Sequence, residues 1–189
     1  MKEFDKKEAI FNAMLELIVK HGFHASPMSD VAKHANVAAG TIYHYFKSKD
    51  ELICALYVRH KEQMNEILFK NDDPSRLFKD RFRIFYLLLF NHYTKNKNEF
   101  IFLEQFINSP FVNTFSRADL QKFDQPTYDF IRKAIFTQVL RDISPKILIS
   151  MIMGSAHALI KLQLSGEYNI SLSELETAFL VCWDGIKRP

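Results

Sequence analysis

The chain has 189 residues, of which 48% are hydrophobic and 25% charged, and its formal net charge is +3 at pH 7. This balance is that of an ordinary globular protein and excludes a fibrous or intrinsically disordered chain. Only five glycines and six prolines occur, and apolar residues recur at helical spacing almost throughout. An all-α fold is therefore predicted.

The two cysteines and the first residues indicate the cellular setting. Cys54 and Cys182 lie far apart without metal-ligand spacing, so we interpret them as buried free thiols and expect neither a metal nor a cofactor. Residues 1–8 are mostly charged and do not resemble a secretory signal, so we expect a cytoplasmic protein. The longest apolar run, Ile84–Phe90, is far shorter than the roughly 20 residues of a membrane span, so we expect no membrane partner.

The first predicted helix carries a single apolar stripe from Ile10 to Ile18 and ends at Gly22, which suits a left-handed C-cap. Phe23 is expected to fold back on that stripe. For the second helix, Ser26 is the predicted N-cap and Pro27 the first-turn residue. Asn36 follows this helix as a residue that tolerates the left-handed turn conformation.

A third short helix is predicted over roughly 38–45, and a long helix then opens at a capping box formed by Ser48 and Glu51. Residues 71–74 break the helical pattern. From Phe69 to Phe136 the chain holds 13 of its 18 phenylalanines. We expect Pro110 and Pro126 to interrupt this aromatic-rich half, with a helix resuming over about 127–140.

Two well-punctuated helices close the chain. Ser144 and Pro145 start the first and Gly166 ends it, and Ser171 with Glu174 forms a second capping box. The small residues on the first of these helices permit close helix approach. We expect the two helices to form a hairpin, and two such hairpins to pair across a two-fold axis.

Three short helices within fewer than fifty residues, the last two joined by a tight turn, form a helix-turn-helix arrangement. The last helix of such a unit enters the major groove of DNA. From Lys20 to Lys49 the chain carries four lysines against one acidic residue, Asp30, which makes this region modestly basic.

The segment from Met28 to Leu52 closely resembles the signature of tetracycline-repressor-like (TetR-like) regulators. The matching positions are Val31, Ala32, Ala35, Val37, Gly40, Thr41, Ile42, Tyr43, Tyr45, Phe46, Ser48, Lys49 and Leu52. Asn36 departs from the usual glycine. The close resemblance covers about the first 55 residues and implies a helix-turn-helix DNA-binding domain over 1–48. A long helix would join it to a larger ligand-binding and dimerisation domain over 49–189.

The resemblance also implies roles at individual positions. Thr41, Tyr43, Tyr45 and the lysines Lys47 and Lys49 are expected at phosphates, while Ala38, Ala39, Gly40 and His44 lie where base edges would be read. We count Ser26 among the DNA-contacting candidates. Tyr43 and Tyr45 as core aromatics, and the two lysines as solvated surface charges, remain alternatives.

In TetR-like proteins the C-terminal helices enclose an effector and form the dimer, so the resemblance implies both. The partners expected are double-stranded operator DNA, a small hydrophobic or aromatic effector and a second copy of the chain. The pocket candidates are Tyr86, Tyr93, Phe102, Phe106, Phe130 and His157. The dimer-interface candidates are Met151, Ser155, Leu159, Leu162, Leu175, Phe179 and Trp183. Packing within the core is the alternative for each pocket candidate.

The signatures of common enzyme classes do not occur in this chain. The sequence holds no Gly-x-Ser-x-Gly elbow, His-Glu-x-x-His motif, phosphate-binding glycine loop or dinucleotide fingerprint, so we do not expect an enzyme. His21 and His24 have no acidic or cysteine partner nearby to complete a metal site. A transcriptional activator, or a ligand-binding module without operator affinity, remains open on the same fold.

Overall fold

The computed structural model describes residues 3–189, with the side chains of residues 5–116, 119 and 122–189. Over these residues the regular elements are helices, as predicted. They are α1 (Glu3–His21), α2 (Met28–His34), α3 (Ala39–Tyr45), α4 (Lys49–Phe69), α5 (Phe78–Lys95), α6 (Lys97–Ile107), the 3-10 helix η1 (Pro110–Thr114), α7 (Arg117–Phe136), α8 (Pro145–Ser165) and α9 (Leu172–Ile186).

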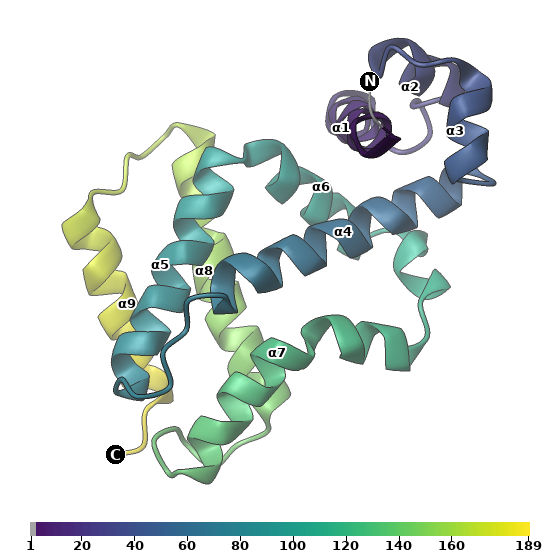
Figure 1. Ribbon diagram of the computed structural model, residues 1–189. Helices are drawn as coiled ribbons and strands as arrows, with labels where there is room; N and C mark the ends of the chain where they lie inside the picture. The colour runs from purple at the N-terminus through teal and green to yellow at the C-terminus, as the bar shows by residue number, and fades with distance from the viewer. Residues whose placement is uncertain (1–2) are drawn as a thin grey trace. The chain divides into compact units, whose positions relative to one another are not determined.

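The chain divides into two compact units, and α4 contributes to both (Figure 1). Unit 1 is built from residues 1–61 and 98–120, and unit 2 from residues 62–97 and 121–189. The predicted domain boundary at residue 48 lies inside unit 1. Unit 1 therefore joins the three N-terminal helices to the start of α4 and to nearly all of α6.

Unit 1 is organised around α1, which packs against α2, while α2 packs against α3 (Figure 1). The predicted stripe of α1 is fully buried at Ile10, Met14 and Ile18. Gly22 takes the left-handed conformation with φ 77°, and its amide donates to the Ile18 carbonyl at 2.7 Å. The predicted end of the first helix is confirmed.

The turn between α2 and α3 is a Schellman motif with Asn36 at its left-handed position, φ 52°. The Asn36 amide donates to the Lys33 carbonyl at 3.2 Å, and the Val37 amide donates to the Ala32 carbonyl at 3.0 Å. These two bonds satisfy carbonyls that the end of α2 leaves without helical partners. The role predicted for Asn36 is confirmed.

Two predictions near the start of α2 are wrong. Ser26 does not cap α2, because its hydroxyl donates to the Gly22 carbonyl at 2.8 Å, and Pro27 is the N-cap instead. Phe23 does not fold back on the α1 stripe alone. Its ring lies 5.0 Å from that of Phe111 and 6.3 Å from that of Phe102, so aromatic residues distant in sequence attract it.

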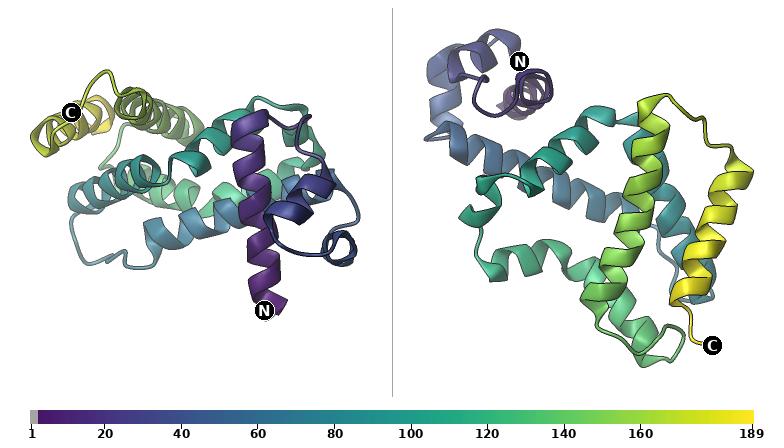
Figure 2. Two further views of the ribbon diagram at one scale, coloured as in Figure 1. Left: turned by 90° about the horizontal axis from the view of Figure 1, so that it is seen from above. Right: turned by 180° about the vertical axis from the view of Figure 1, so that it is seen from behind.

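Unit 2 is built on α5, which packs against both α8 and α9 (Figures 1 and 2). Its buried residues recur at helical spacing from Phe82 to Tyr93. The ring of Phe82 lies 5.6 Å from that of Phe179 and 6.2 Å from that of Trp183. Much of the phenylalanine excess seen in the sequence is therefore core.

The helix predicted to begin after Pro126 instead runs through this residue, as α7. A proline inside a helix removes one amide and disturbs the carbonyls of the preceding turn. Here the Asn65 side-chain amide donates to the Phe123 carbonyl at 2.9 Å and supplies a substitute donor. The helix also ends earlier than predicted, because Gln138 adopts φ 59° in a second Schellman motif.

The predicted limits of the last two helices are confirmed. Pro145 is the first residue of α8, Gly166 ends that helix with φ 75°, and Ser171 with Glu174 forms a complete capping box at α9. By length and composition α8 also resembles a membrane-spanning helix, with a window of mean hydropathy 1.6 that is 22% buried. One such helix is weak evidence for a membrane span, since soluble core helices share these properties.

Candidate nucleic-acid interface and effector region

The outward surface of α3 is uncharged and formed by small residues and aromatic rings. Ala38, Ala39 and Gly40 are exposed at the start of the helix, and Tyr43 and His44 are exposed one turn later. Tyr43 is 56% exposed, a large fraction for a tyrosine, while Ile42 between them is fully buried. The helix thus keeps one side chain for the core and presents the rest.

Small residues at the start of α3 let the backbone approach another surface closely, and alanine methyls suit contact with a thymine methyl. Direct hydrogen-bonded reading of bases from this turn is limited, because its only side-chain donor is the half-buried Thr41. Tyr43 and His44 supply the exposed polar groups of the helix. Such a surface favours recognition that combines phosphate contacts with DNA shape.

The two lysines after α3 differ in their surroundings. The side chain of Lys47 is exposed, and its backbone amide donates to Glu51 Oε2 at 2.7 Å. Lys49 is half-buried, and its ammonium donates to the His24 carbonyl at 3.3 Å. Because an ammonium has three donors, this bond leaves Lys49 able to contact a phosphate as well.

The predicted capping box at the start of α4 is present in a shifted form. The Ser48 hydroxyl accepts from the Glu51 amide at 3.1 Å, as predicted. The Glu51 carboxylate, however, accepts from the amide of Lys47 rather than from that of Ser48. The connection between α3 and α4 is therefore held by hydrogen bonds from both directions.

Two of the DNA-contacting candidates face the protein interior to different degrees. Ser26 is fully buried with its hydroxyl bonded to Gly22, so its described position does not allow contact with DNA. Tyr45 is half-buried, and its ring lies 5.4 Å from the ring of His44 and 6.3 Å from that of Phe46. Tyr45 thus has a packing role whatever its hydroxyl contacts.

In unit 2, one polar cluster lies within the aromatic core. The Tyr86 hydroxyl is 3.2 Å from Ser155 Oγ, which in turn is 3.6 Å from Cys182 Sγ. Burial raises the pKa of both the Tyr86 phenol and the Cys182 thiol, so both stay neutral. Sequence reasoning placed Ser155 in the interface and interpreted Cys182 only as a buried thiol. Neither the serine nor the thiol was assigned to a polar cluster.

The six pocket candidates fall in both units. Tyr93 and His157 meet edge to face with ring centroids 6.3 Å apart, and Phe130 packs on Phe85 at 5.7 Å. These residues and Tyr86 belong to unit 2. Phe102 and Phe106 belong to unit 1, where Phe106 stacks on Tyr57 at 4.2 Å.

The outer face of α8 and α9 is apolar. Ile147, Met151 and Leu162 are exposed on α8, and Leu180 and Val181 on α9. Of the predicted interface residues, Ser155 and Leu159 are half-buried. Leu175, Phe179 and Trp183 are buried inside unit 2, because the other face of α9 covers α5. They therefore lie on the inner side of the hairpin rather than on its exposed surface.

Comparison with known protein families gives two matches that together cover almost the whole chain. The model of bacterial regulatory proteins of the tetR family matches residues 10–56. The model of the tetracyclin repressor-like C-terminal domain matches residues 57–188. The second match alone covers more than half of the chain.

Curated relatives resemble shorter parts of the chain. A fatty acid metabolism regulator protein of Bacillus subtilis is 39% identical over 64 residues, which are 34% of this chain and 31% of the relative. An uncharacterised HTH-type transcriptional regulator of Haemophilus influenzae is 40% identical over 79 residues, which are 42% of each chain. The matched segments thus span less than half the length of these relatives.

Solved structures resemble the chain over nearly its full length. A TetR family transcription regulator from Marinobacter aquaeolei superposes with a TM-score of 0.89 at 18% identity, covering 98% of this chain and 97% of the other. A TetR-family regulator from Haemophilus influenzae gives 0.82 at 26% identity and 98% coverage of both. The transcriptional regulator FadR from Bacillus subtilis, in complex with stearoyl-CoA, gives 0.78 at 19% identity, covering 95% and 98%. With both family models matched in sequence order, this chain belongs to the tetR family of bacterial regulatory proteins.

Proposed function

We propose that this protein is a homodimeric transcriptional repressor that binds double-stranded operator DNA through α3 and leaves it when a small hydrophobic or aromatic effector binds. In this proposal it acts by binding alone and catalyses no reaction. The observation that carries the proposal is the helix-turn-helix of unit 1. Its recognition helix keeps Ile42 in the core and exposes Ala39, Gly40, Tyr43 and His44.

The charge around α3 supports DNA as the partner. The helix contains no acidic residue, and Lys47 and Lys49 follow directly after it. Phosphate contacts from such lysines and from the Tyr43 hydroxyl position a protein on the duplex, while the alanines approach base edges. Base-edge hydrogen bonds are few on this surface, so we expect the operator to be recognised in part by its shape.

The outer face of α8 supports a second copy as the dimer partner. Along it, Ile147, Met151 and Leu162 alternate with the exposed small residues Gly154 and Ala158. This pattern lets two helices approach closely and bury apolar surface, as in a four-helix interface. We accordingly assign the interface to this face with Leu180 and Val181 of α9, rather than to the inner residues of α9.

The core of unit 2 supports an apolar effector. The hydroxyls of Tyr86 and Ser155 and the ring of His157 are polar groups placed among aromatic side chains, which is the usual composition of a small-molecule site. Two of the proteins that resemble this chain are regulators of fatty acid metabolism by name, and one of those structures holds stearoyl-CoA. A long apolar molecule is therefore the first class of effector to test.

The test is an electrophoretic mobility shift of the purified protein with the intergenic DNA upstream of its own gene. A scrambled duplex serves as the control, at two salt concentrations. We expect selective binding as one dimeric step that weakens steeply with salt. Fatty acids and their acyl-CoA thioesters are then titrated into the complex. Binding of equal strength to the scrambled duplex would contradict the proposal and favour a ligand-binding module without operator affinity.

A further inference from the structure

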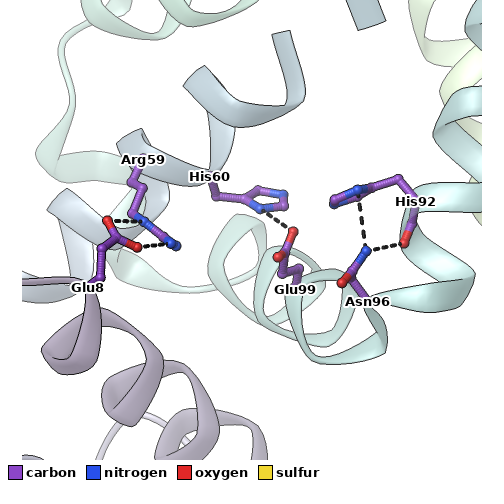
Figure 3. Close-up of polar contacts among 6 residues, drawn as sticks. All are labelled: Glu8, Arg59, His60, His92, Asn96 and Glu99. Atoms are coloured by element: carbon purple, nitrogen blue, oxygen red, sulfur yellow. Dashed lines mark hydrogen bonds and ion pairs between the residues drawn. The ribbon is translucent and has the colours of Figure 1, made fainter. Parts of the chain in front are cut away.

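Within unit 1, α1 and α4 are joined by a contact that lies outside the helix-turn-helix motif. The Arg59 guanidinium donates two hydrogen bonds to the Glu8 carboxylate, from Nε to Oε1 at 3.1 Å and from Nη2 to Oε2 (Figure 3). Both side chains are mostly buried, at 21% and 30% exposure. A two-point arginine–carboxylate contact fixes the angle as well as the distance between its helices.

The same guanidinium also lies against the core of α1. Its central carbon is 5.4 Å from the ring centroid of Phe11, which is 4% exposed and packs 5.4 Å from Phe46. Arg59 thus bridges a charged partner and an aromatic partner on one helix. The next residue, His60, faces a different helix, since its Nδ1 is 3.4 Å from Glu99 Oε2 on α6 (Figure 3).

A second contact attaches the N-terminal helices to α4 at another point. The Lys49 ammonium, at the first residue of α4, donates to the His24 carbonyl between α1 and α2. Lys49 and Arg59 are ten residues apart on one helix, a rise of roughly 15 Å. One attachment leaves rotation about its contact free, whereas two attachments separated along a rigid helix remove that rotation.

The orientation fixed in this way is passed to α3, because α1 packs on α2 and α2 packs on α3. A two-fold dimer requires its two recognition helices to reach major grooves at a set separation, so their orientation matters for affinity. We propose that Arg59 is a positioning residue for DNA binding, which with Glu8 locks the helix-turn-helix onto α4 without touching DNA. This inference rests on the proposed function.

The closing experiment compares Arg59→Gln, Glu8→Gln and the exchanged pair Glu8→Arg with Arg59→Glu in the full-length protein. Arg83→Gln is the matched control, because Arg83 makes a similar two-point contact with Glu176 between α5 and α9 in unit 2. Each single variant at Glu8 or Arg59 should bind the selected operator roughly tenfold more weakly. The exchanged pair should recover much of this affinity, and Arg83→Gln should bind like the wild type.

Two further readouts separate positioning from other roles. The slope of log affinity against log salt should be unchanged in Arg59→Gln, since Arg59 neutralises no phosphate; a slope reduced by about 0.9 would make Arg59 a phosphate ligand and overturn the proposal. Spin labels at the exposed positions Lys33 and Glu62 should report a broader distance distribution in Arg59→Gln than in the wild type. Melting curves verify that each variant is folded.

The outcomes are distinguishable from failure of the proposed function. Wild-type protein that selects no DNA sequence would refute the operator proposal, and the distance distributions would still decide whether Arg59 fixes α1 on α4. A folded Arg59→Gln protein with wild-type affinity and an unbroadened distribution would overturn the positioning role.

Discussion

At the scale of single residues, the lysines beside the recognition helix are the simplest test of DNA contact. Replacing Lys47 or Lys49 by alanine should weaken operator binding and lower the salt slope by about 0.9 for each phosphate that is no longer neutralised. The Lys49 variant should also lose the bond to His24. Affinity measured over a salt series gives both quantities.

Lys70→Ala is the control for these variants, because Lys70 is exposed on the chain just after α4 and pairs with Glu66 in unit 2. Its salt slope should equal that of the wild type. An unchanged slope in both Lys47→Ala and Lys49→Ala would show that neither lysine contacts phosphate.

Asn36 is a second position where one side chain decides the local backbone. Its φ of 52° disfavours residues with an ordinary Cβ, whereas glycine adopts it freely. Asn36→Ala should therefore lower the free energy of unfolding by about 1 kcal/mol, and Asn36→Gly should not. Urea unfolding curves of the two variants measure the difference, and equal stabilities would refute this account of the turn.

At the scale of elements, the capping box of α9 ties stability to pH through Glu174. Hydrogen bonds from Ser171 first, and then from Tyr168, lower the pKa of Glu174 from an ordinary 4.5 to about 2. The ionised carboxylate therefore stabilises the folded state above about pH 4.5, and this contribution is lost as the pH falls toward 2. The sign follows from a folded pKa below the unfolded one.

Glu174→Gln should accordingly be less stable than the wild type at pH 7, with the difference shrinking as the pH falls below 4.5. Ser171→Ala should cost about 1 kcal/mol at pH 7, the usual effect of losing an N-cap. Denaturant unfolding at pH 7 and pH 3.5 tests both. A Glu174→Gln difference that does not change with pH would exclude the carboxylate as its source.

Helix boundaries were predictable from the sequence where a local signal sets them. Gly22, Gly166 and the capping box at Ser171 each act within one turn, and the structure places all three as predicted. Pro126 misled because Asn65, far away in sequence, supplies the hydrogen bond that lets α7 continue. Gln138 carries no sequence signal for the left-handed turn that it forms.

The candidate site divides in the same way. The exposed face of α3 follows from a short motif, whereas the burial of Ser26 depends on a bond to the turn after α1. The contact between Glu8 and Arg59 joins residues 51 positions apart, and no periodicity within either helix indicates it. Sequence patterns thus located the recognition helix but not the contacts that orient it.

At the scale of the whole molecule, the apolar face of α8 predicts the oligomeric state. Met151 is 49% exposed near the middle of that face, so a charge placed there would be buried without a partner in a dimer. Met151→Glu should yield a folded monomer in sedimentation velocity and bind the operator far more weakly. Leu77→Glu, at a residue that is 75% exposed and outside α8 and α9, should remain dimeric.

The interrupted make-up of unit 1 has a consequence for how the protein is made. Residues 1–61 leave the ribosome well before residues 98–120, which complete the unit. Until then Phe23 and Tyr57 lack the rings of Phe106 and Phe111 against which they pack. At about 5–20 residues per second, several seconds of synthesis separate the two segments. Nascent chains stalled in that interval should need chaperone protection, and an excised N-terminal fragment would inherit the same sticky surface.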